Sequence, residues 1–160
     1  MSSTSKQNSP YDEIDVDSKV ILNDRWVHLG ILIDRSASMD EMDSEELVGA
    51  ATTLVKEQQN NVNIDRVTST IANFDEYFEI VKRNIDASDL VLTRDDIKPR
   101  GMTSLVPALG RMITIIGNDL VDMQTERPGT VVIILLSDGE QTCDHLRNRE
   151  ESDSPYEGSD

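Results

Sequence analysis

The sequence contains few of the residues that stabilise secreted proteins or anchor proteins in a membrane. Cys143 is its one cysteine, so no intramolecular disulfide can form. No run of about 18 apolar residues is present to span a bilayer. The first ten residues are polar and lack the apolar segment of a secretory signal. We therefore expect a cytoplasmic protein without a membrane anchor.

Basic residues are also scarce. The 160 residues include 15 Lys and Arg against 31 Asp and Glu, which gives a formal net charge of −16 at pH 7. Nucleic acids and anionic membrane surfaces bind proteins through Lys and Arg, so we expect neither as a partner. The excess of acid supports solubility and suits a basic or metal-bridged protein partner.

Apolar patterning predicts alternating strands and helices in one domain between residues 19 and 143. A turn at residues 73–76 makes the second and third strands antiparallel, and Pro128 with Gly129 is expected to form another turn. Alternation of this kind is typical of an α/β layered fold. We expect strands at residues 26–33, 66–74, 77–81 and 131–136, helices at 43–59 and 104–120, and a loop at 86–100.

The two ends of the chain have a different composition. Residues 1–18 are rich in polar and acidic side chains, and they are expected to form a disordered leader. Residues 144–160 contain many acidic residues and no apolar period, which predicts a disordered acidic tail.

Three short polar segments adjoin the predicted elements and share one chemistry. Residues 34–38 read Asp-Arg-Ser-Ala-Ser, residues 101–105 read Gly-Met-Thr-Ser-Leu, and residues 137–140 read Ser-Asp-Gly-Glu. Their carboxylates and hydroxyls are hard oxygen ligands, which suit Mg²⁺ and not zinc or copper. Ligands of doubly wound sheets bind at the carboxyl ends of the strands, so we expect Asp34 and Asp138 in one crevice.

In this order the segments resemble the metal-ion-dependent adhesion site of the von Willebrand factor type A family. The family pattern is D-x-S-x-S after a buried strand, a later loop Thr, and an Asp after another buried strand. The resemblance covers residues 27–140 and implies a doubly wound, Rossmann-like, mostly parallel sheet with an antiparallel edge strand. Ala37 stands where the family often has Gly. The implied metal ligands are Asp34, Ser36, Ser38, Thr103 and Asp138.

The resemblance also implies what this site does. The hydroxyls would contact the ion directly, and Asp34 and Asp138 would act largely through water. The expected ion is Mg²⁺, with Mn²⁺ or Ca²⁺ as alternatives. Its open coordination position would capture an Asp or Glu carboxylate of a partner protein, and no enzymatic activity is expected.

Each of these residues also has an ordinary structural role when it is taken alone. Ser36 and Ser38 suit a turn, and either Thr103 or Ser104 suits the N-cap of the second helix. Asp138 followed by Gly139 is a common turn sequence.

Family members continue beyond the last site Asp with further strands and helices, which this sequence lacks. The expected strand order is third, second, first and then residues 131–136 at the edge. An apolar strand at an exposed edge is prone to pair with another chain, so we expect self-association there. A gene fragment, a partner that supplies the missing strands, and a marginally stable truncated fold remain alternative explanations.

Two other functions are kept as alternatives. A Mg²⁺-dependent phosphatase of the haloacid dehalogenase type also places Asp after a buried strand. Such an enzyme needs a second Asp two residues later, where this chain has Ser36, and a late Lys, whereas no Lys follows Lys98. The other alternative is a truncated fragment without a function.

Overall fold

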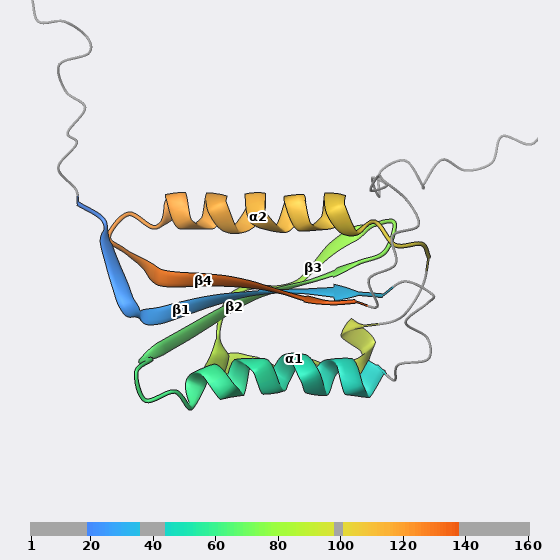
Figure 1. Ribbon diagram of the computed structural model, residues 1–160, viewed down its shortest axis with the longest axis horizontal. Helices are drawn as coiled ribbons and strands as arrows, with labels where there is room; N and C mark the ends of the chain where they lie inside the picture. Colours follow the sequence, from blue (N-terminus) through green and yellow to red (C-terminus); the bar gives the residue numbers. More distant parts are fainter. Residues whose placement is uncertain (1–18, 36–43, 98–100, 138–160) are drawn as a thin grey trace, which may run out of the picture.

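A computed structural model describes residues 19–35, 44–97 and 101–137 of the chain. The strands form one four-stranded sheet with an α-helix on either side (Figure 1). Every predicted helix and strand is present, which confirms the α/β class. The elements are β1 (Ile21–Asp34), α1 (Ser44–Gln59), β2 (Arg66–Phe74), β3 (Phe78–Asp86), the 3₁₀ helices η2 (Ala87–Asp89) and η3 (Arg94–Asp96), α2 (Leu105–Asp122) and β4 (Glu126–Leu136).

The sheet has the predicted strand order, β3-β2-β1-β4. Strand β1 runs parallel to both β2 and β4, and β2 pairs antiparallel with β3. The sheet is therefore mostly parallel with an antiparallel edge strand, as the sequence predicts. The predicted leader (1–18) and acidic tail (144–160) lie outside the described residues.

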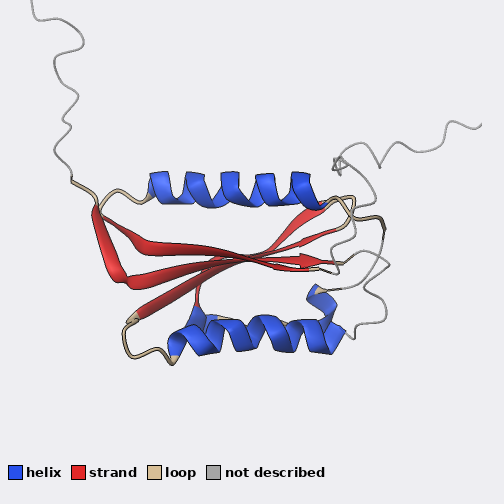
Figure 2. Ribbon diagram, in the orientation of Figure 1, coloured by secondary structure: helices blue, strands red, loops and turns tan. Residues whose placement is uncertain are grey.

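The two helices enclose the sheet from opposite sides (Figure 2). Successive residues of β1 pack on opposite faces of the sheet. Ile31 belongs to the apolar cluster that includes Leu47 of α1, and Leu32 belongs to the cluster that includes Met112 of α2. Because both faces of β1 are covered, its second half is apolar on consecutive residues, as is typical of a central parallel strand.

Strands β1 and β3 are longer than the sequence predicts. The first begins at Ile21 and not at residue 26, because Ile21 and Leu22 pair with the start of β4. The third begins at Phe78 and continues to Asp86, beyond residue 81. Its second half is polar, which an edge strand with partly exposed side chains tolerates.

The prediction of a turn at Pro128 and Gly129 is wrong, because both residues lie inside β4. Among the described residues β4 pairs with β1 alone, so the missing N–H of Pro128 can face the unpaired side. The register shifts between Asn23 and Val27 of β1. A Cβ on Gly129 would lie 2.8 Å from the backbone oxygen of Asn23 and from Cα of Asp24. The Pro-Gly pair therefore fits an irregular edge pairing.

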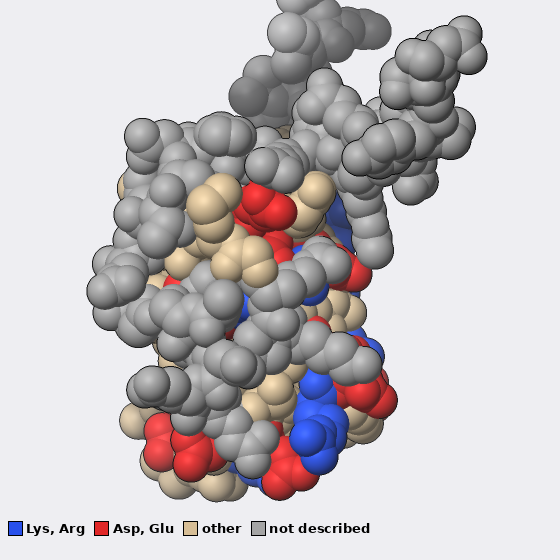
Figure 3. Space-filling model, turned by 90° about the vertical axis from the view of Figure 1, so that its right-hand side faces the viewer, with Lys and Arg blue, Asp and Glu red and all other residues tan. Residues whose placement is uncertain are grey.

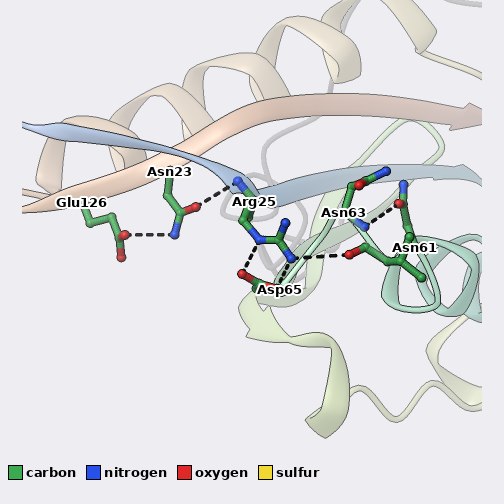
Figure 4. A network of polar contacts seen from close by, with 7 residues as sticks. Asn23, Arg25, Asn61, Asn63, Asp65 and Glu126 are labelled. Atoms are coloured by element: carbon green, nitrogen blue, oxygen red, sulfur yellow. Dashed lines mark hydrogen bonds and ion pairs between the residues drawn. The ribbon is translucent and has the colours of Figure 1, made fainter.

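A polar network joins the strands at the end of the sheet where β1, β2 and β4 begin (Figure 4). The Arg25 guanidinium donates to both carboxylate oxygens of Asp65, at 2.5 and 2.6 Å. Asn23 donates to Glu126 over 2.9 Å and accepts from the backbone N–H of Arg25. Hydrogen bonding to Arg25 lowers the pKa of Asp65 below its ordinary value.

No helix among the described residues is long and apolar enough to cross a membrane.

Candidate functional site

The two described members of the predicted ligand set, Asp34 and Thr103, belong to the opposite end of the sheet, where β1 and β4 end. Asp34 is the last residue of β1 and is 0% exposed. It pairs in register with Phe74, the last residue of β2, so both parallel strands end at one level. Figure 3 views this end of the molecule, and acidic side chains are spread over the described part of it.

Ser137 connects the end of β4 with the end of β1. Its Oγ donates to Oδ2 of Asp34 over 2.7 Å. Ile33 and Leu136 are register partners just before these two residues. The first and third polar segments of the sequence are therefore in contact. This is expected when two neighbouring parallel strands end at the same edge of a sheet.

The second polar segment precedes α2, and its hydroxyl residues are buried. Thr103 is 1% exposed, and Ser104 is fully buried. Ser104 occupies the N-cap position of α2, but its side chain makes no capping hydrogen bond. Its carbonyl accepts the first helical bond, from the N–H of Ala108, over 3.1 Å. Helix capping by the Ser104 side chain therefore does not explain this segment.

Three of the five predicted ligands lie outside the described residues: Ser36, Ser38 and Asp138. Asp34 and Thr103 are described, and both are buried. Asp138 directly follows Ser137 in the sequence, and Ser36 follows Asp34 by two residues. The described residues next to Ser36 and Asp138, which are Arg35 and Ser137, thus belong to the same end of the sheet.

The structure adds an ion-pair cluster that the sequence analysis missed. Arg35 is buried, with its Nε 3.2 Å from Oδ2 of Asp75 and its Nη1 2.9 Å from Oε2 of Glu79. Its Nη2 atom has no hydrogen-bond partner among the described residues. Asp75 is fully buried and directly follows β2. The sequence does offer a signal for this cluster, because Asp75 is an acidic residue directly after the strand at residues 66–74. The sequence analysis assigns residues 73–76 only to a turn.

The described candidate ligands carry oxygen donors of the type that a hard cation prefers. Asp34 and Thr103 offer a carboxylate and a hydroxyl, both of which are oxygen ligands suited to Mg²⁺. The positive charge of Arg35 is engaged by Asp75 and Glu79. Within the described residues, no three or more His, Cys, Asp and Glu side chains form a metal-binding group.

No protein-family model matches the chain, and no curated protein matches it. Among solved structures the chain is similar to the ArnB paralog VWA2 from Sulfolobus acidocaldarius, at 25% sequence identity and a TM-score of 0.47. The match covers 79% of this chain and 31% of that protein, so the chain spans about a third of its length. A likeness of this size does not establish family membership.

Proposed function

We propose that the chain is a von Willebrand factor type A-like module that binds a partner protein through a divalent cation. Mg²⁺ is the proposed ion, with Mn²⁺ or Ca²⁺ as substitutes. Its ligands would be Asp34, Ser36, Ser38, Thr103 and Asp138. The proposal rests on the ordered sequence motif and on the arrangement of its described residues.

The main structural observation in support of the proposal is the 2.7 Å hydrogen bond between Ser137 Oγ and Asp34 Oδ2. These residues are 103 positions apart in the sequence, yet they meet at the ends of two neighbouring parallel strands. The strand order reverses here, because β2 and β4 lie on opposite sides of β1. Open α/β sheets bind their ligands at the carboxyl ends of the strands at such a point. A buried carboxylate is stabilised by hydrogen bonds and by positive charge, and a bound cation would supply positive charge next to Asp34.

The ligand chemistry favours capture of a carboxylate over bond breaking. Hydroxyls of Ser36, Ser38 and Thr103 are neutral, so direct contact with them would leave the ion electron-poor. Asp34 and Asp138 would balance its charge mainly through water. An Asp or Glu of the partner protein would then fill the open coordination position, because Mg²⁺ prefers oxygen ligands. The proposed partner is therefore a protein that presents an acidic side chain.

We place this function in the cytoplasm. The lone Cys143 favours that compartment over an oxidising one, where disulfides form. Intracellular Mg²⁺ would then be the available ion.

Calorimetric titration with Mg²⁺ and Mn²⁺ tests the proposal. Asp34→Ala should abolish binding, because it removes the buried carboxylate at the end of β1. Asp65→Ala is the matched control, since Asp65 is an ion-paired carboxylate at the opposite end of the sheet. Wild type and Asp65→Ala should bind alike. Equal binding by Asp34→Ala would overturn the assignment.

A further inference from the structure

Asp75 joins three segments that are far apart in the sequence. Its carboxylate accepts from Nε of Arg35, at 3.2 Å, and from the backbone N–H of Tyr77, at 2.7 Å. Its carbonyl accepts from the backbone N–H of Ser104, at 3.1 Å, and its own N–H donates to the carbonyl of Tyr77. The end of β1, the turn after β2 and the loop before α2 therefore meet at one residue.

The contact with Arg35 fixes the chain just after β1. The backbone N–H of Arg35 donates to the carbonyl of Phe74 over 2.8 Å, which extends the pairing of β1 with β2 by one residue. Its side chain then turns to Asp75 and Glu79, where it is buried. A buried guanidinium held by two carboxylates has a restricted position. Asp34, the neighbouring residue, is restricted with it.

The contact with Ser104 fixes the loop before α2. Gly101 lies against the same residue, because a Cβ on it would sit 3.4 Å from Cβ of Asp75. Gly101 has φ +69°, a conformation that L side chains rarely adopt. The loop can therefore approach Asp75 closely, and Thr103 lies between these two anchored positions.

We propose that Asp75 is a positioning residue that sets the spacing between Asp34 and Thr103. The inference rests on the proposed metal function, since it concerns the same site. Asp75 itself is not a ligand in this account, because its carboxylate is committed to Arg35 and Tyr77. Residues that orient metal ligands affect metal affinity by about 10- to 100-fold when they are changed.

Asp75→Asn tests the inference in the full chain, with two measurements. Mn²⁺ affinity is measured by counting free Mn²⁺ with electron paramagnetic resonance, and we expect a loss of about 10- to 100-fold. Amide hydrogen exchange is measured without metal, and we expect faster exchange at Arg35 and Ser104 with no change at Ile71 in the centre of β2. A residue with only a general structural role would instead accelerate exchange throughout β2.

Two further variants complete the design. Asp119→Asn breaks a more exposed ion pair, with Arg83 at 2.5 Å, in the last turn of α2 and so at the helix end opposite to Ser104, and should leave Mn²⁺ affinity unchanged. Arg35→Lys keeps the positive charge but not the forked geometry, so it tests the same contact if Asp75→Asn fails to fold. We expect Arg35→Lys to lose at least about tenfold in Mn²⁺ affinity.

The outcomes separate this inference from the proposed function. Wild type that binds Mn²⁺, with weaker binding and local exchange changes in the variants, supports both. Wild type and Asp75→Asn that bind Mn²⁺ equally would overturn the positioning role alone. Uniformly faster exchange would overturn it as well. Wild type without Mn²⁺ binding would overturn the proposed function, and the positioning role with it.

Discussion

At the scale of single residues, His28 has a buried and well-defined environment. Its side chain is 2% exposed, with Nδ1 2.8 Å from Oγ1 of Thr68 and Nε2 3.1 Å from Oγ1 of Thr70. Trp26 donates to the Thr68 hydroxyl, and the backbone N–H of Asn84 donates to that of Thr70. If Thr68 accepts from Trp26 and donates to Nδ1, the imidazole proton is on Nε2. This assignment gives both ring nitrogens a partner in the neutral form.

We expect acid to destabilise the fold through His28. Burial lowers the pKa of His28 below 6.5, and the opposing attraction of Asp119 is smaller. Below pH 6.5 the unfolded chain therefore binds a proton that the folded chain does not, so protonation favours unfolding. The free energy of unfolding, measured with urea, should fall as the pH decreases from neutrality through this range.

His28→Gln provides the comparison, because Gln can hydrogen-bond both threonines and does not titrate. This variant should show a weaker pH dependence than wild type above the range in which carboxylates protonate. Identical slopes for the two proteins would show that His28 does not contribute.

Ser36 leads to a second prediction at this scale. A phosphatase of the haloacid dehalogenase type needs a carboxylic acid at that position to protonate the leaving group, and a serine hydroxyl is far too weak an acid. We therefore expect no metal-dependent hydrolysis of p-nitrophenyl phosphate above the buffer rate. Turnover by wild type that Asp34→Asn abolishes would contradict this and favour the enzyme alternative.

The candidate site could be predicted from the sequence only where its residues follow a local pattern. Asp34 directly follows the predicted strand at residues 26–33, and Thr103 directly precedes the predicted helix at 104–120, so short-range patterning locates both positions. Asp75 also directly follows a predicted strand, but that position alone does not predict its contacts. Its role depends on the pairing of β1 with β2 and on the approach of Gly101, which join residues far apart in the chain.

At the scale of elements, periodicity identifies the interiors of helices and strands better than their ends. Helix α1 and strand β2 follow the predicted ranges within one residue. The extensions of β1 and β3 depend on pairing with a neighbouring strand, which leaves no mark in the local sequence. Pro128 and Gly129 were misinterpreted for the same reason, because an edge strand tolerates residues that elsewhere favour a turn.

At the scale of the whole molecule, the two edges of the sheet differ in character. Strand β3 has charged residues such as Lys82 and Arg83, which discourage pairing with another chain. Strand β4 is apolar over residues 131–136, and Val132 is 40% exposed. The helices pack mainly on β1 and β2, so the edge strands β3 and β4 are less covered than the two central strands. Among the described residues, no strand pairs with the outer side of β4.

We therefore expect the chain to self-associate through β4. A net charge of −16 opposes association of two copies, so the tendency should grow as salt screens the repulsion. Sedimentation velocity at low ionic strength and at about 0.15 M salt measures this, because the screening length falls to about 8 Å at the higher value. A monomer at both ionic strengths would contradict the prediction.

The position of a new charge separates edge pairing from a general effect of charge. Val132→Lys places a cation on the exposed part of β4 and should reduce association. Val121→Lys adds the same charge on α2, where Val121 is 68% exposed, and should leave association unchanged. Ile133 packs against the α2 cluster, so Ile133→Lys should instead destabilise the fold, by roughly 3 kcal/mol in urea denaturation. Equal association of Val132→Lys and Val121→Lys would place the contact elsewhere on the surface.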